Sequence, residues 1–141
     1  MQVTYRISPG GNSGINYRSE AVAGLAYALR GYQADIDYAN KYTGMNYEER
    51  GRTTVARRGE HVVLPPVDTS APANGPEDNR WPARQVVASL GDDGALRAAI
   101  RDNDWNTYRI LARGNRLQHY VNGVLMSDIT DRDPVHRRRG G

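Results

Sequence analysis

The sequence predicts an all-β protein, an antiparallel β-sandwich or jelly roll, on three observations. Several stretches of about four to eight residues alternate apolar and polar side chains, which is the pattern of half-buried strands. Turn-forming residues, mainly Gly, Asn, Asp and Pro, separate these stretches at short intervals. Only residues 94–100 are expected to form a helix. Many short strands with frequent turns are typical of sandwiches and jelly rolls.

The first strands are expected at the beginning of the chain. Residues 3–7 and 15–17 alternate on either side of a Gly-rich turn at 8–14, which predicts two consecutive strands joined by that turn as a hairpin. Residues 20–30 fit either an Ala-rich helix or an extended segment, and we favour the extended segment because Gly24 weakens a helix.

The middle of the chain continues the alternation. Further strands are expected at residues 32–37, 43–48, 53–56 and 61–64. Residues 65–82 contain five Pro and form the longest expected loop. A short strand at 85–90 follows it.

The last third has the clearest pattern. Asp92 is a suitable N-cap for the single short helix at 94–100. Strands are then expected at 107–113, 117–121 and 124–129. Asn122-Gly123 lies between the last two strands and is the strongest short signal for a β-hairpin.

Composition excludes several classes of protein. The absence of Cys excludes disulfides, Cys-ligated zinc and a Cys nucleophile. The net charge of +3 equals the charge of Arg137, Arg138 and Arg139, so the excess is terminal rather than spread over a face, and we expect no nucleic-acid partner. No apolar run approaches the ~20 residues of a membrane span. The start of the chain has no apolar region typical of a signal peptide.

The polar side of the strand at 32–37 is a candidate ligand face. Gln33, Asp35 and Asp37 alternate with three apolar residues. They either face water or belong to a sheet face that binds a polar ligand such as a sugar. Arg18, Asn46 and Glu48 are expected at similar positions on neighbouring strands, which would extend the patch.

Several of these residues are also candidates for acid–base chemistry. Asp35, Asp37, Glu48 and Glu49 could supply a pair of carboxylates. His119 shares a strand face with Leu117 and Val121, so it is either a hydrogen-bonded core residue or a group that titrates near neutrality. No His or carboxylate cluster has the spacing of a metal site, so we expect neither a metal nor a cofactor.

Seven segments, taken in order, resemble the 3-keto-disaccharide hydrolase family. They include NSGINYR at 12–18, YTGMNYEERGR at 42–52 and GNRLQHYVNG at 114–123. The others are residues 31–36, 56–59, 104–110 and 128–131. The resemblance extends over about residues 3–140.

The resemblance implies a concanavalin A-like jelly roll that acts on glycosides oxidised to a ketone at C3. A base would remove the C2 proton, an enolate would form, and the C1 substituent would leave before water adds. The implied partner is a carbohydrate substrate, and the implied location is secreted or periplasmic. The implied catalytic residues are Asp35, Glu48 and His119. The implied substrate-binding residues are Arg18, Gln33, Asp37, Glu49, Arg52 and Asn122.

The resemblance also bears on the extent of the domain. Family members carry strands before the segment at residue 3 and after the Arg-rich stretch at 137–139. We therefore expect residues 1–141 to form a single jelly-roll domain that lacks its first and last strands. Two alternatives stay open at this stage: a non-catalytic carbohydrate-binding module and an inactive fragment.

Overall fold

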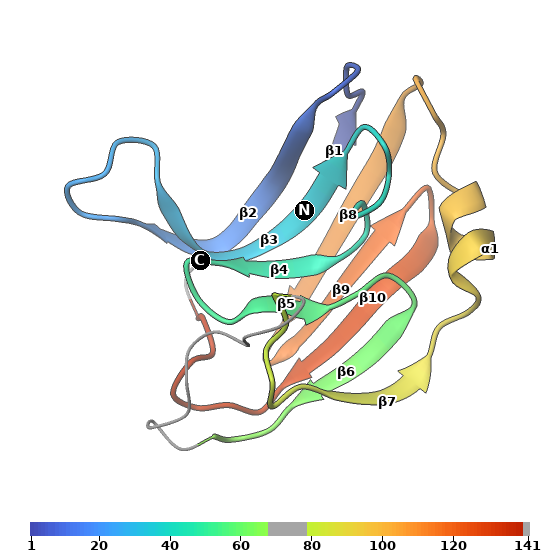
Figure 1. Ribbon diagram of the computed structural model, residues 1–141. Helices are drawn as coiled ribbons and strands as arrows, with labels where there is room; N and C mark the ends of the chain where they lie inside the picture. The colour runs from blue at the N-terminus through green and yellow to red at the C-terminus, as the bar shows by residue number, and fades with distance from the viewer. Residues whose placement is uncertain (68–78, 140–141) are drawn as a thin grey trace.

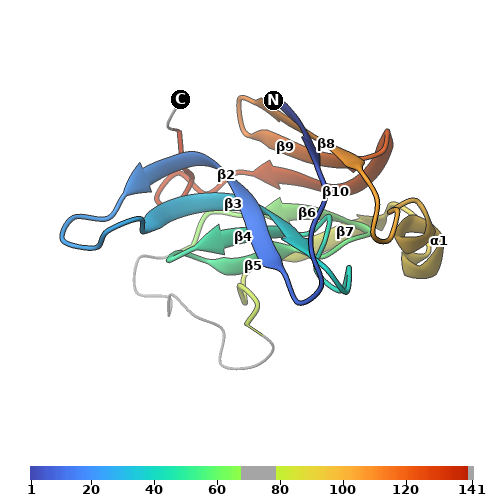
Figure 2. The same ribbon diagram turned by 90° about the horizontal axis from the view of Figure 1, so that it is seen from above.

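The computed structural model describes residues 1–67 and 79–139, which form two β-sheets packed face to face (Figures 1 and 2). The larger sheet contains, in spatial order, β1 (Gln2–Tyr5), β8 (Asn106–Arg113), β9 (Arg116–Val121), β10 (Val124–Asp131), β6 (Glu60–Leu64) and β7 (Gln85–Ser89). The smaller sheet contains β2 (Asn12–Ala21), β3 (Leu29–Asp37), β4 (Asn46–Glu49) and β5 (Thr53–Ala56). One short helix, α1 (Asp93–Ala98), lies at the side of the sandwich. The predicted all-β sandwich with one short helix is confirmed.

The core fills the space between the sheets because each strand turns alternate residues inward. Tyr32 and Ala34 of β3 are fully buried, and they share one cluster with Ile110 of β8 and with Leu117 of β9. In a chain without Phe, tyrosines occupy several large core positions, and each buried phenolic oxygen then needs a hydrogen-bond partner. Polar side chains such as Asn46 and His119 are accordingly buried between the sheets beside these tyrosines.

Two strand predictions are wrong in part. Strands β1 and β2 do not pair with each other: β1 pairs with β8, and β2 pairs with β3. The Gly-rich turn carries the chain from one sheet to the other, which lets Tyr5 pack against Tyr108 of the larger sheet. The strand expected at 43–48 begins only at Asn46, because Gly44 has a φ of 96° and lies in a turn.

The segments between the strands also differ from expectation. Residues 22–28 form an ordered loop in which the amide of Val22 donates to the carbonyl of Ala28. Of the long Pro-rich loop expected at 65–82, residues 68–78 lie outside the described part of the chain. Its end is described, and there Trp81 is buried with only 1 % of its surface exposed.

Candidate functional site

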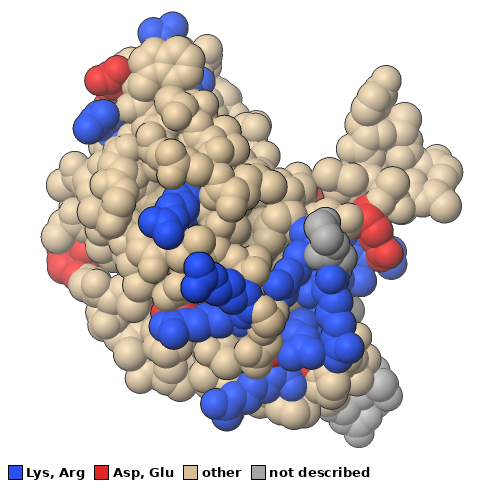
Figure 3. Space-filling view, turned by 180° about the vertical axis from the view of Figure 1, so that it is seen from behind, with Lys and Arg blue, Asp and Glu red and all other residues tan. Residues whose placement is uncertain are grey.

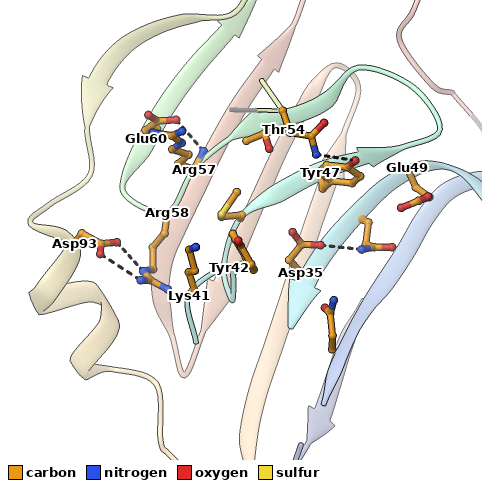
Figure 4. Close-up of a pocket in the computed structure, with 14 residues that line it drawn as sticks. Asp35, Lys41, Tyr42, Tyr47, Glu49, Thr54, Arg57, Arg58, Glu60 and Asp93 are labelled. Atoms are coloured by element: carbon orange, nitrogen blue, oxygen red, sulfur yellow. Dashed lines mark hydrogen bonds and ion pairs between the residues drawn. The ribbon is translucent and has the colours of Figure 1, made fainter. Parts of the chain in front are cut away.

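A cleft of about 810 Å³ lies on the outer face of the smaller sheet (Figure 4). The pairing of β3 with β4 determines which side chains reach it. Gln33 pairs with Tyr47 and faces outward, whereas Tyr32 pairs with Glu48 and faces the core. The side chains of Asp35 and Glu49 therefore line the cleft on the same face as Gln33 and Tyr47. Loop residues close its other side, among them Lys41, Tyr42, Arg57 and Arg58.

Asp35 is the carboxylate with the most altered acidity in the cleft. Burial raises the pKa of Asp35 to about 6. Gln33 Nε2 donates to Asp35 Oδ1 at 2.8 Å, which lowers the pKa in part, and the charges of Asp37 and Glu49 raise it further. A carboxyl group that titrates near neutrality can both accept and return a proton under physiological conditions.

Cationic side chains lie opposite the carboxylates. Figure 4 shows Asp35 and Glu49 on one side of the cleft and Lys41, Arg57 and Arg58 on the other. Arg58 is held in place, because its guanidinium donates to Asp93 at 2.8 Å and to the carbonyl oxygens of Asn40 and Thr43. The ammonium of Lys41 lies 5.1 Å from the ring centre of Tyr42, a cation–π contact that leaves its N–H donors available to a ligand.

Asp37 holds the loop that carries Lys41 and Tyr42. Its carboxylate accepts hydrogen bonds from the backbone amides of Lys41, Tyr42 and Thr43 at 2.8–3.0 Å. Asp37 was predicted to bind substrate. The structure places it beneath the cleft, where it positions other residues instead of lining the cavity.

Glu48 and Arg52 lie in the interior, on the opposite side of the smaller sheet from Asp35. Arg52 Nε is 2.5 Å from Glu48 Oε2, and Arg52 also contacts Asp131 at 2.5 Å and Asp133 at 3.7 Å. The side chains of these four residues are at most 1 % exposed. The expected contiguous patch of Asp35 with Asn46 and Glu48 is therefore wrong, because the β3–β4 register turns Asn46 and Glu48 inward.

His119 is also fully buried, between the two sheets. Its Nε2 is 2.9 Å from the hydroxyl of Tyr17, and its Nδ1 is 3.1 Å from the carbonyl oxygen of Met45. Tyr108 contacts Nδ1 through its hydroxyl at 3.2 Å. Burial lowers the pKa of His119 to about 4, so the ring is neutral over most of the pH range in which proteins work.

The burial of His119 predicts a pH-dependent stability. Because the folded pKa of about 4 lies below the ordinary 6.5, the unfolded chain binds the proton first, and stability falls as the pH drops below about 6.5. We expect this group alone to lower the free energy of unfolding by about 2 kcal/mol between pH 7 and pH 5. Denaturant titrations of the wild type and His119→Gln at both pH values test this, because all other titrating groups cancel in the difference. Equal pH dependence in the two proteins would contradict it.

The other two predicted binding residues lie away from the cleft. Arg18, at a bulge in β2, donates to the backbone oxygens of Ala112 in β8 and of Gly114 in the turn after β8. Asn122 stands in the β9–β10 turn with a φ of 50°. Its side-chain oxygen accepts from the amide of Thr107, and its side-chain nitrogen donates to Ala99 and Asn106 at 2.8 Å.

Asn122 is accordingly predicted to contribute to stability. Asn122→Ala removes these hydrogen bonds. It also leaves Ala at a positive φ, where the backbone strain is no longer offset by side-chain hydrogen bonds. We therefore expect a loss of about 2 kcal/mol in the free energy of unfolding. Urea unfolding measures the effect. Asn115→Ala, in the neighbouring turn, is the matched control and should change stability by less than about 0.5 kcal/mol. Equal effects of the two substitutions would show that the hydrogen bonds of Asn122 contribute little.

Several cleft residues were not predicted from the sequence. The position of Tyr47 in the cleft can be inferred from that of Gln33 once the pairing of β3 with β4 is known, because paired residues lie on the same face of the sheet. Lys41, Tyr42 and Arg57 come from loops, for which side-chain alternation gives no signal.

In the described part of the chain, no group of three or more His, Cys, Asp or Glu side chains is arranged to hold a metal ion. Within the same residues, no helix has the length and apolar character needed to cross a bilayer.

The family to which this sequence belongs is identified by comparison with known proteins. A search of curated proteins gave no match. The family model described as the 3-keto-alpha-glucoside-1,2-lyase-like domain matches residues 1–140, nearly the full length of the sequence. The sandwich and its polar cleft therefore belong to a member of the 3-keto-disaccharide hydrolase family.

Proposed function

We propose that this protein cleaves glycosides that carry a ketone at C3, by elimination across C1 and C2. The family match supports the reaction class, and the cleft supports the substrate class. The observation that carries the proposal is Asp35, a cleft carboxylate with a pKa of about 6, which faces cationic side chains across the cavity. We also propose a secreted or periplasmic location, on family membership alone.

The proposed reaction begins with removal of the C2 proton by the Asp35 carboxylate. The C3 ketone makes this proton acidic, because the electron pair of the C2–H bond delocalises into an enolate oxygen. The enolate then re-forms the C3 carbonyl, a double bond forms between C1 and C2, and the C1–O bond breaks. The protonated Asp35 can return its proton to the departing oxygen, and water can later add to C1 to complete hydrolysis.

The other cleft residues would bind the sugar and stabilise charge. Lys41 is the proposed donor to the enolate oxygen, because its ammonium keeps free N–H groups over the cleft. The carboxylate of Glu49 can accept hydrogen bonds from sugar hydroxyls, and the side-chain amide of Gln33 can donate and accept them. Tyr42 and Tyr47 offer aromatic faces for the ring. Glu48, Arg52 and His119 are proposed to support the fold rather than to contact substrate, because all three are buried.

The test uses a 3-keto-disaccharide and the same disaccharide without the ketone. We expect release of the C1 substituent only from the oxidised sugar. In D₂O, NMR should show deuterium at C2 of the released 3-keto sugar, because C2 loses its proton in the elimination and gains a deuteron when D₂O adds across C1 and C2. Cleavage of both sugars at similar rates would reject the elimination mechanism, since the unoxidised sugar has no acidic C2 proton.

A carbohydrate-binding module without catalysis is the alternative. It is favoured by the positions of Glu48 and His119, two candidate catalytic groups that do not reach the cleft. Calorimetric titration with glycans separates the two functions. Binding of 3-keto and unoxidised sugars without product release would show that the protein is a carbohydrate-binding module.

A further inference from the structure

The β2–β3 connection forms an apolar arm that extends away from the sandwich (Figure 1). Residues 21–29, which we call the apolar arm, read Ala-Val-Ala-Gly-Leu-Ala-Tyr-Ala-Leu and contain no charged residue. Leu25, Tyr27 and Leu29 have 50 %, 104 % and 37 % of their surfaces exposed. A group of exposed large apolar side chains indicates an interaction surface, because exposure of apolar side chains to water does not stabilise the folded monomer.

A group of arginines surrounds the base of the apolar arm. We call it the basic collar, and it consists of Arg18, Arg30, Arg137, Arg138 and Arg139. Arg30 of β3 lies opposite Glu20 of β2 in the strand register at the base of the arm. Arg138 forms an ion pair with Glu20 at 3.5 Å. Arg18, Arg137 and Arg139 line a cavity of about 370 Å³. Figure 3 shows the positive side chains gathered on one face of the molecule beside the arm.

The charge of the basic collar is only partly neutralised. Arg18 and Arg137 donate to backbone carbonyl oxygens, which carry no full charge. No described carboxylate forms an ion pair with Arg18, Arg137 or Arg139, whereas the buried Arg52 has several. The collar therefore presents positive charge and free N–H donors next to an uncharged apolar tip.

We propose that this surface docks onto an anionic phospholipid bilayer. Leu25 and Tyr27 would enter the boundary between headgroups and acyl chains, where apolar and aromatic side chains are favourable, and the basic collar would contact the anionic headgroups. A second copy of the chain is a poorer occupant. A symmetric contact would bring one basic collar against another, and a narrow arm offers little flat surface for a stable dimer.

Co-sedimentation with vesicles tests the proposal. Vesicles of phosphatidylcholine alone are compared with vesicles that also contain phosphatidylglycerol, at low and high salt. We expect binding to the anionic vesicles only, with a decrease at high salt because the electrostatic contribution is screened. Leu25→Ser with Tyr27→Ser, and separately Arg137→Ser with Arg139→Ser, should each reduce the bound fraction about tenfold.

Matched variants control for loss of apolar surface and of charge. Val86→Ser with Val87→Ser removes two exposed apolar side chains of β7, and Arg6→Ser with Arg101→Ser removes two charges elsewhere. Both should bind vesicles as the wild type does. The proposal is overturned if the wild type does not sediment, if the arm variant sediments equally well, or if the arm variant instead converts a dimer to a monomer. The proposal is also overturned if an acidic polysaccharide displaces the protein from vesicles and the substitutions at Leu25 and Tyr27 have no effect. The partner would then be an acidic glycan.

Discussion

Replacing Arg52 by Met is expected to lower the free energy of unfolding by about 3–5 kcal/mol, the largest effect on stability that we predict. Arg52 is the central cation of a buried network with Glu48, Asp131 and Asp133. Met fills most of the same volume but leaves three carboxylates without that cation in a low-dielectric interior. Thermal and urea unfolding measure the loss.

The network has further partners, but they do not replace Arg52. Arg138 reaches Glu48 at 3.1 Å and His136 reaches Asp133 at 2.6 Å, from a segment at the edge of the sandwich. Tyr32 donates its hydroxyl hydrogen to Asp131 at 2.5 Å and packs beneath the guanidinium. Among the described residues, only Arg52 contacts all three carboxylates, and its planar fork allows the two contacts with Asp131.

Three further substitutions make the test of Arg52 decisive. Arg52→Lys keeps the charge and should cost less than Arg52→Met, which keeps the measurement possible if the Met variant does not fold. Asp131→Asn combined with Arg52→Met should recover part of the loss, because it removes one unpaired charge. Arg97→Met breaks an ion pair with the exposed Asp102 and should cost under about 1 kcal/mol. Similar losses for Arg97→Met and Arg52→Met would mean that burial adds nothing to the network.

This network also shows what sequence patterns cannot predict. Alternation and turn residues are local signals, and they identified the strands of the last third and the hairpin at Asn122. The contact of Arg52 with Asp131 joins positions 79 residues apart, and no local pattern encodes it. Side-chain alternation alone predicts the wrong face for Glu48, because its side depends on the register between β3 and β4, and a shift of one residue reverses the faces.

Asp35, in contrast, was predictable as a cleft residue. It lies on the same strand as Gln33, two residues away, so a single alternation places both on the outer face. Its raised pKa was not predictable in detail, because burial and the charge of Glu49 come from the folded sheet. The Gly-rich turn at 8–14 illustrates the same limit: its residues fit a hairpin and a crossing between sheets equally well, and only the packing of β1 on β8 distinguishes them.

Asp35→Asn is expected to reduce kcat/KM for a 3-keto-glycoside about 10²–10⁴-fold, because Asn keeps the size and the hydrogen bond from Gln33 but cannot accept the C2 proton. In the wild type, kcat/KM should rise with pH through about 6, as the carboxyl group of Asp35 loses its proton. Initial rates across this pH range measure both effects.

The same substitution should stabilise the fold at neutral pH. The folded pKa of about 6 exceeds the ordinary 3.8, so Asp35 contributes stability below about pH 4 and loses that contribution as the pH rises through 6. Removing the charge should therefore raise the free energy of unfolding at pH 7 by about 2 kcal/mol relative to the wild type, with little difference at pH 4. Asp35 and His119 thus act in opposite directions between pH 5 and pH 7, so the wild type alone shows a flatter profile than either group predicts.

A loss of activity together with a gain in stability distinguishes a functional carboxylate from a structural one, because a structural residue would lose both. Asp104→Asn, an exposed carboxyl group outside the cleft, is the control and should change neither quantity. If Asp35→Asn retains wild-type turnover, another group is the base. If it instead unfolds more easily at pH 7, the carboxylate of Asp35 stabilises the sheet, and the predicted gain in stability from removing its charge is wrong.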